Sequence, residues 1–300
     1  MTTPTPVLDR PAATSLRTID RHTKRRRQRS TLVRILLTTS MVIAVLPLVL
    51  ILFEVTRRGL STLSWEFLTT TQPPSRREGG GYLHGIIGST YMVGIATLLS
   101  VPLGILAAVY LNEYGTGTLA KVIRFFTDVM TGVPSVFVGL FVYAALVRQI
   151  GFGTLVGGLG LAVLMLPIVV RSSEEMLKLV PDDQRAAAIG LGARKWQTVT
   201  RVVLPTAKPG LITGSMLAVA RGAGETAVLI LTALGSSQVV TALQGTPQAA
   251  IPLLIYRGAR QPFAPGQERA WAGALVLLAF VLVLTLAARY IGSRGRLPTR

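Results

Sequence analysis

The segment PDDQRAAAIGLG, residues 181–192, opens the stretch around which the rest of the chain is organised. Asp182 and Asp183 follow its proline, in what would be the first turn of a helix, where the positive end of the helix dipole favours carboxylates. Ala186–Ala188 are strong helix formers with almost no side chain, and Gly192 is typical of a helix end. The pattern predicts a short helix, slim enough to enter a groove on another protein. A plain surface helix that only joins two spans is the alternative.

Two charged residues interrupt an apolar run farther along the chain, from about Pro209 to Leu234. Arg221 and Glu225 are four residues apart, so on one helix they would share a face, with their Cβ atoms about 6 Å apart. Ionisable side chains inside a membrane span are costly and usually functional. A guanidinium is always charged and forms two parallel hydrogen bonds to an oxyanion. The pair therefore predicts a pathway for an anion inside the bilayer, and a structural pair that locks two helices together is the alternative.

The composition is that of a membrane protein. Half of the 300 residues are hydrophobic and only 15% are charged, which is atypical of a soluble domain. The formal net charge is +18, but most basic residues lie at the predicted cytoplasmic ends of spans, which argues against nucleic-acid binding. The absence of cysteine excludes disulfides and thiolate metal sites, and the two histidines are too far apart in sequence to build a metal centre by themselves. We therefore expect no metal and no cofactor.

Six apolar runs predict six transmembrane helices, because each is long enough to cross about 30 Å of hydrocarbon. They are residues 35–53, 85–111, 129–147, a fourth run that ends at Val170, 209–234 and 270–288. The distribution of Lys and Arg places both termini in the cytoplasm. The fold class is therefore an all-α membrane protein. The segment GVPS, residues 132–135, should interrupt helical hydrogen bonding, which a membrane tolerates only where protein or water satisfies the freed groups.

The same pattern divides the chain into four regions. They are a basic, disordered cytoplasmic tail (1–30), the first transmembrane helix with an external loop (31–83), a transmembrane core with the slim helix at about 181–193 (84–292), and a basic C-terminal tail (293–300). Residues 236–269 are expected on the outside, and the sequence assigns them no role.

Small residues recur every four positions along the predicted fifth span. They are Gly210, Gly214, Ala218 and Gly222. Such a stripe lets another helix approach closely, which is how membrane helices associate without a hydrophobic driving force. We expect this face to pack against a neighbouring helix.

The segment AAAIGLG, followed by nine residues and then Val-x-Leu-Pro, resembles the cytoplasmic loop signature of binding-protein-dependent ABC importer permeases. The matching residues are Ala187, Ala188, Gly192, Leu204 and Pro205. In that family this loop contacts the ATPase subunit. Ala186 stands where the family usually has Glu, so one polar contact to the ATPase is missing, and Arg185 or Asp183 could supply another.

Four further segments are similar to PstA-type permeases of phosphate-specific ABC importers. They are ARGAGETA (220–227), LPIVVRSSEEML (166–177), GVPS (132–135) and PLGILAAVYLNEY (102–114). The resemblance implies a type I ABC importer permease fold and phosphate as the substrate. It also implies three kinds of partner: an ATPase subunit dimer, a homologous permease subunit and an extracytoplasmic phosphate-binding protein.

With phosphate as the substrate, the chemistry of Arg221 and Glu225 predicts separate roles for them on that pathway. Arg221 would meet the phosphate oxygens during passage. Glu225 would compete for Arg221 when substrate leaves, and it could accept a hydrogen bond from protonated phosphate, which sulfate cannot offer near neutral pH.

No nucleotide-binding motif of the form G-x-x-x-x-G-K-[ST] occurs in the sequence, so any ATP hydrolysis should occur on a separate polypeptide and the chain itself is not expected to be an enzyme. A permease for another oxyanion, such as sulfate or molybdate, is a second hypothesis. A structural or sensory membrane subunit is a third. An intramembrane enzyme is disfavoured, because no nucleophile with its base and no set of metal ligands can be identified.

Overall fold

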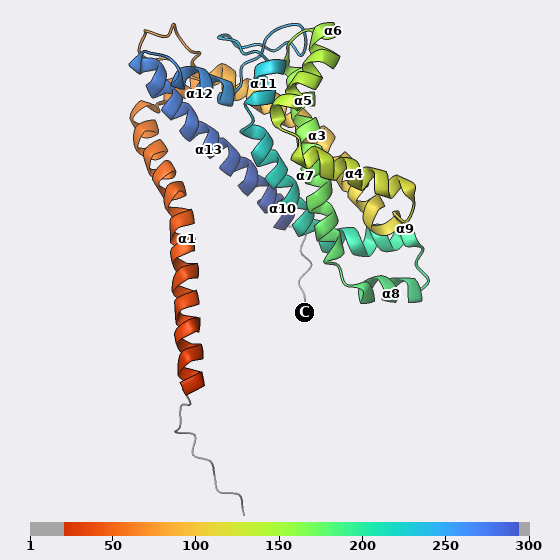
Figure 1. Ribbon diagram of the computed structural model, residues 1–300. Coiled ribbons are helices and arrows are strands. Elements are labelled where there is room, and N and C mark those ends of the chain that lie inside the picture. The colour runs from red at the N-terminus through yellow and green to blue at the C-terminus, as the bar shows by residue number, and fades with distance from the viewer. Residues whose placement is uncertain (1–20, 294–300) are drawn as a thin grey trace, which may run out of the picture. The chain divides into compact units, whose positions relative to one another are not determined.

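The computed structural model describes residues 21–293, with side chains from Arg26 to Tyr290, and its elements are helices (Figure 1). In chain order they are α1 (Arg21–Thr62), α2 (Trp65–Thr69), α3 (Leu83–Val109), the π-helical turn η1 (Tyr110–Tyr114), α4 (Thr118–Gly132), α5 (Ser135–Val142), the π-helical turn η2 (Tyr143–Val147), α6 (Arg148–Ile150), α7 (Thr154–Lys178), α8 (Asp182–Gly190), α9 (Lys195–Thr198), the π-helical turn η3 (Val199–Val203), α10 (Leu204–Ala223), α11 (Ala227–Thr232), α12 (Ile251–Ala259) and α13 (Ala264–Ser293). No β-strand occurs between residues 21 and 293, where a single isolated bridge joins Leu234 and Gln248.

Contacts along the chain define two units, residues 1–53 and 54–300. The described part of the first unit is the beginning of α1, and every described side chain from Arg26 to Phe53 is exposed. The prediction of a disordered tail over residues 1–30 is wrong for residues 21–30, because α1 begins at Arg21. Lys, Arg and Gln are good helix formers, so this basic run can extend the apolar helix that follows it. Residues 1–20 lie outside the described residues, as do residues 294–300 of the predicted C-terminal tail.

The expected number of spans agrees with the structure. Within the described residues, five helices are long and apolar enough to cross a membrane, and the total is six when one bent helix pair is counted as a single span. The five are Arg26–Thr62, Leu83–Tyr114, Thr154–Lys178, Lys195–Ala223 and Ala264–Tyr290. The chain is thus an all-α membrane protein. The cytoplasmic position of its two termini stays a prediction.

The predicted third span, residues 129–147, falls on a bent pair of helices, Thr118–Gly132 and Ser135–Ile150, with a bend of 109° at the break between them. Pro134 causes the bend, because its ring forces the preceding residue out of the helical region. Val133 is accordingly extended, with φ −72° and ψ 127°. The interruption expected at GVPS is therefore present, but it turns the chain sharply and does not merely kink one helix.

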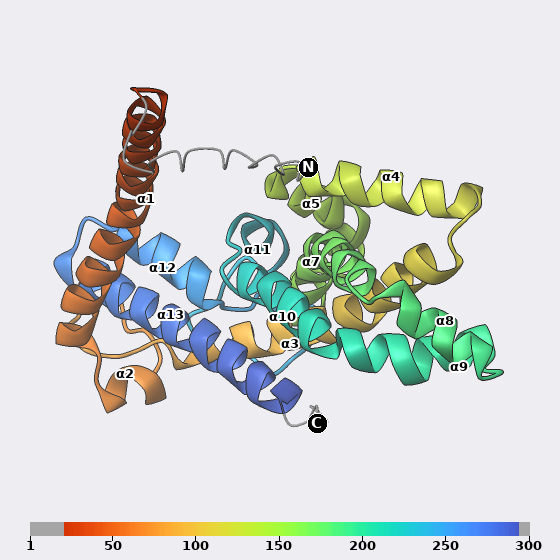
Figure 2. The same ribbon diagram turned by 90° about the horizontal axis from the view of Figure 1, so that it is seen from below.

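Glycines let the central helices of the second unit pack closely. α3 and α7 lie side by side in both views (Figures 1 and 2). A Cβ atom built on Gly104 of α3 would lie 2.6 Å from Cγ1 of Val169 on α7, a distance that real side chains do not reach. The helix α10 approaches α7 in the same way. Cβ atoms built on Gly210, Gly214 and Gly222 would meet side chains of α7 at 2.6 to 2.7 Å.

The two ends of the helix bundle in the second unit differ. α8 and α9 lie at one end, and α11, α12 and the loop between them lie at the other (Figure 1). Tyr82 joins α2 to α12 at the end of the bundle where α11 and α12 lie. Its ring is buried, and the ring centroid lies 5.0 Å from that of Phe67 on α2. Its hydroxyl donates a hydrogen bond to the carbonyl oxygen of Leu254 on α12 at 3.2 Å. Burial raises the pKa of the Tyr82 phenol above its ordinary value, so the hydroxyl remains a donor.

The contact between α3 and α7 predicts the effect of a matched pair of substitutions. Gly104→Leu should lower the melting temperature of the detergent-purified protein strongly, because overpacking a tight contact costs about 1–3 kcal/mol or more. Gly94→Leu on the same helix should have little effect, since a Cβ atom there has no neighbour within 4 Å. Equal melting temperatures for the two variants would contradict this packing.

Candidate functional site

The slim helix predicted at 181–193 is α8, Asp182–Gly190. Pro181 precedes it in an extended conformation, with φ −62° and ψ 140°, and the two aspartates occupy its first turn. Gly192 ends the turn with φ +84°, in the left-handed region that glycine adopts without strain. The helix stands clear of the bundle: the side chain of Leu191 is 90% exposed and that of Ile189 57%. α8 is therefore available to a partner along much of its length (Figure 2).

The residues of the loop signature fall into two groups. Ala186, Ala187 and Gly192 are exposed on and after α8, and Ala188 is half-buried. Leu204 and Pro205 lie apart from them, at the start of α10, where Leu204 packs on a cluster that includes Val180 and Leu177. The signature thus covers both an exposed helix and its attachment to the bundle.

Arg185 does not extend toward a partner, and the suggestion that it could replace the missing Glu in a contact to the ATPase is not supported. Its side chain is only 17% exposed. It forms an ion pair with Glu113 of η1, with Nη2 and Nε of Arg185 at 3.1 and 3.3 Å from Oε1 of Glu113. It also donates to the carbonyl oxygens of Leu177, at 2.9 Å, and of Val180. Asp183 remains exposed and has no hydrogen-bond or ion-pair partner among the described residues.

The ion pair joins α8 to the end of α3. Glu113 is 8% exposed and lies in the π-helical turn that continues α3. A second contact reaches the same turn, because Nζ of Lys195 on α9 lies 4.9 Å from the ring centroid of Tyr114. Both short helices that follow α7 are therefore fixed to η1. π-Helical turns are rare and occur often at functional sites.

A second buried carboxylate connects α4 to α7 near this junction. Glu174 on α7 is 2% exposed. Its Oε1 atom lies 3.1 Å from Nε of Arg124 on α4 and 3.2 Å from Nζ of Lys178. Nη2 of Arg124 also donates to the carbonyl oxygen of Leu111 at 2.9 Å. Salt bridges and hydrogen bonds thus tie α4 and α8 to the same end of α3.

Arg221 and Glu225 do not share a helix face, which corrects the prediction of a continuous fifth span. α10 ends at Ala223, Gly224 adopts φ −91° and ψ 0°, and α11 begins only at Ala227. Glu225 therefore lies in the break, where its Oε1 atom accepts a hydrogen bond from the backbone N–H of Ala227 at 3.0 Å. Glycine is a poor helix former, and two of them flank Ala223, so the helix ends there.

The break separates the two charges. Glu225 satisfies an N–H at the start of α11, where a carboxylate is favoured. Arg221 lies in the last turn of α10 and is exposed. It has no hydrogen-bond or ion-pair partner among the residues that the structure describes. The guanidinium is thus exposed and unpaired within the described part of the chain.

The sequence did not identify the partners of Arg185, Glu113 and Glu174. The sequence does show opposite charges at the predicted cytoplasmic ends of several spans, which indicates that ion pairs form there but not which residues pair. Glu113 and Arg185 are 72 residues apart, so their pairing depends on how α3 and α7 end.

These features define a multi-span membrane protein of the transport class: a helical bundle with two broken spans, a cation at one break, and an exposed slim helix at one end. The chain belongs to the family of binding-protein-dependent transport system inner membrane components, whose sequence profile matches residues 100–296. It is therefore a multi-pass protein of the inner membrane.

Relatives and solved structures agree with this assignment. The chain is 44% identical over 242 residues to the phosphate transport system permease protein PstA of Pasteurella multocida strain Pm70, covering 80% of this chain and 85% of that protein. It is 40% identical over 284 residues to the phosphate transport system permease protein PstA 1 of Mycobacterium tuberculosis strain CDC 1551 / Oshkosh, covering 91% and 93%. Its fold is similar to a chain of a bacterial alginate ABC transporter in complex with an alginate pentasaccharide-bound periplasmic protein. The TM-score is 0.65 at 17% identity, with 89% of this chain and 96% of that chain covered.

The attachment of α8 makes a prediction that hydrogen exchange can check. Arg185→Ala should speed the exchange of the backbone amides of α8 about tenfold or more, because each hydrogen bond to a charged group contributes about 1.5–3 kcal/mol. Asp183→Ala, which removes an exposed side chain of the same helix, should change exchange far less. Indistinguishable exchange in the two variants would show that Arg185 does not hold α8 in place.

Proposed function

We propose that the chain is a permease subunit of an ATP-driven phosphate importer and forms the translocation pathway together with a homologous permease subunit. The observation that carries this proposal is the match to two proteins named as phosphate transport system permeases, at 40% and 44% identity over most of both chains. At the break in the fifth span, the exposed Arg221 supplies the chemistry that an oxyanion requires.

ATP hydrolysis takes place on a separate ATPase subunit, present as a dimer. The slim, exposed α8 offers these subunits a surface from which no long side chain protrudes along Ala186–Ala188. Motion of the ATPase pair reaches the bundle through the contacts of Arg185 and Lys195 with η1. An extracytoplasmic phosphate-binding protein delivers the substrate at the opposite end. The alginate transporter with a similar fold has been solved with a periplasmic protein bound, which is consistent with such a partner.

Arg221 contacts the phosphate oxygens during passage. Its guanidinium can form two parallel hydrogen bonds to an oxyanion. It also lies in a membrane span, where a permanent charge is energetically costly and usually has a function. Glu225 holds the start of α11 through Ala227 and so maintains the break. Its carboxylate can also accept a hydrogen bond from protonated phosphate, which favours phosphate over sulfate.

Uptake by the assembled transporter tests the role of Arg221. Arg221→Ala should reduce phosphate uptake about tenfold to a hundredfold while the subunits still assemble, because a charge-assisted hydrogen bond contributes about 1.5–3 kcal/mol. Arg289→Ala, at an exposed position near the end of α13, serves as the control and should retain uptake. The measurement is the initial rate of radiolabelled phosphate entry into proteoliposomes.

Two results would contradict this assignment. Normal uptake by the Arg221→Ala transporter would remove that residue from the pathway. Wild-type uptake of sulfate or molybdate in preference to phosphate would show that the substrate is another oxyanion. In Glu225→Gln, the ratio of phosphate to sulfate uptake should fall, and an unchanged ratio would exclude Glu225 from selectivity.

A further inference from the structure

A groove of about 630 Å³ runs along one side of α10. Its walls are Val101 and Ile105 of α3, Thr200 of η3, Ala288 of α13 and one face of α10 between Leu204 and Met216. α10 lies between α7 and α13 in both views (Figures 1 and 2), and the groove follows its α13 side. The volume is within the range of about 300–1,000 Å³ that is usual for ligand-binding clefts.

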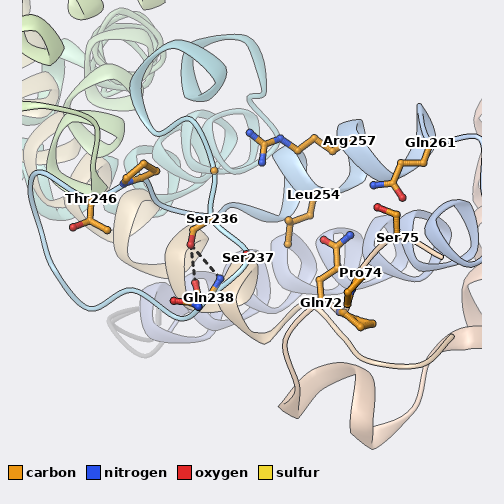
Figure 3. A pocket seen from close by; sticks show the side chains of 13 residues that line it. Gln72, Pro74, Ser75, Ser236, Ser237, Gln238, Thr246, Leu254, Arg257 and Gln261 are labelled. Carbon is orange, nitrogen blue, oxygen red and sulfur yellow. Dashed lines mark hydrogen bonds between the residues drawn. The ribbon is translucent and has the colours of Figure 1, made fainter. Parts of the chain in front are cut away.

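The lining of this groove is apolar except at Thr200, Lys208 and Ser215. The cavity at the other end of the bundle is different, because Gln72, Ser236 and further polar side chains surround it together with Arg257 (Figure 3). A polar cavity suits water. An apolar groove on the membrane-spanning part of a helix suits hydrocarbon.

The groove lies on the side of α10 away from Arg221. Leu217, one turn before Arg221, follows Lys208 by nine residues, which is about two and a half turns of an α-helix. Leu217 is 65% exposed, and it therefore lies on nearly the opposite side of α10 from Lys208. The anion pathway proposed at Arg221 does not use the groove.

The length of the groove matches the depth of one leaflet of a bilayer. Leu204 and Met216 are twelve residues apart, or about 18 Å along the helix axis at 1.5 Å per residue. The hydrocarbon core of a bilayer is about 30 Å thick, so one leaflet contributes about 15 Å. An acyl chain that enters beside Leu204 would thus lie against α10 over the length of the groove.

The charge of the groove is concentrated at its α8 end. Lys208, one turn after Leu204, is the charged residue among the described residues that line it, and it is exposed. It forms no ion pair with a described carboxylate. An unpaired cation within a span is costly, and a Lys side chain relieves that cost by extending along apolar surface toward the headgroups. Basic residues between spans at this depth favour anionic lipid headgroups.

We propose that this groove binds one anionic phospholipid, with its phosphate paired to Lys208 and an acyl chain along Leu211–Met216. The lipid comes from the leaflet on the α8 side, which the function proposed above makes the cytoplasmic one. Leu204, in the wall of the groove, also packs on the cluster that includes Leu177 and Val180, where α8 is attached. A bound lipid would therefore support the start of α10 beside that attachment.

Photolabelling of the assembled transporter in nanodiscs tests the proposal. The nanodiscs are made of phosphatidylcholine and contain a small fraction of phosphatidylglycerol with a diazirine on one acyl chain, and mass spectrometry identifies the labelled peptides. The peptides that carry Val101 with Ile105 and Leu211 to Met216 should be labelled about fivefold more by this probe than by diazirine phosphatidylcholine, because a Lys near the headgroups attracts anionic lipid.

Substitutions of Lys208 test the pairing with the headgroup. Lys208→Ala should reduce labelling by the phosphatidylglycerol probe to the level of the phosphatidylcholine probe. Lys208→Arg keeps the charge and should stay within about twofold of wild type. Lys121→Ala is the matched control, because Lys121 is exposed on α4 and does not line the groove. Its labelling should equal that of wild type.

Filling the groove tests the place of the acyl chain. Ile212→Trp adds volume inside the groove, so labelling of the α3 wall should fall with both probes. Leu286→Trp, at an exposed position of α13 outside the groove, should leave labelling unchanged. Co-purification of the partner subunits shows that each variant still assembles.

Three results would overturn the proposal. The first is equal labelling of the groove by the two probes, or equal labelling of wild type and Lys208→Ala. The second is no labelling by either probe, which would show that a protein segment covers the groove. The third is loss of labelling when inorganic phosphate is added at constant ionic strength, which would make Lys208 a site for the free ion.

Uptake by the wild-type transporter in proteoliposomes is measured in parallel, because photolabelling does not depend on the transported substrate. Uptake of another oxyanion with labelling as expected would remove the proposed function and leave the lipid site. Phosphate uptake without selective labelling would remove only the lipid site.

Discussion

The ion pair between Arg185 and Glu113 is the interaction on which the rest of the structure depends. It joins the exposed α8, carbonyl groups at and just after the end of α7, and the π-helical end of α3, because Arg185 also donates to Leu177 and Val180. Without it, the described residues would hold α8 mainly through its contacts with α9 and η3. With it, a displacement of α8 must move the end of α3, and α3 packs closely along α7 through Gly104 and Gly158. A half-buried pair with several hydrogen bonds of this kind is more rigid than an exposed one, which suits a mechanical link.

The membrane imposes a second constraint, and it explains where the spans are broken. In hydrocarbon every backbone N–H and C=O needs a partner, so irregular backbone is tolerated only where protein or water supplies one. At the break after α10, the Glu225 carboxylate accepts the N–H of Ala227. At the bend between α4 and α5, Pro134 has no N–H to satisfy. Both breaks separate a short apolar helix from a longer one, and the first leaves Arg221 exposed beside it.

The sequence predicted the helical class, the six spans within the described chain and the position of α8, because hydropathy, Gly and Pro act locally. It failed where the outcome depends on two competing local preferences. Arg221 and Glu225 have the spacing of a helix face, yet Gly222 and Gly224 end the helix between them. The sequence did predict an interruption at residues 132–135, but not that the chain would bend there by 109°. The partners of Arg185 could not be found, because a pair 72 residues apart is set by how two long helices end and not by any local pattern.

The number of ATP molecules hydrolysed per phosphate transported is the most direct test of the link between α8 and α3. Glu113→Gln preserves the size of the side chain and removes its charge, so α8 should still dock on the ATPase while its motion is passed on poorly. We expect the assembled transporter with this variant to keep most of its ATP hydrolysis but to transport several-fold less phosphate, so that the ratio rises. A ratio equal to that of wild type, with both rates unchanged or both lowered together, would contradict it.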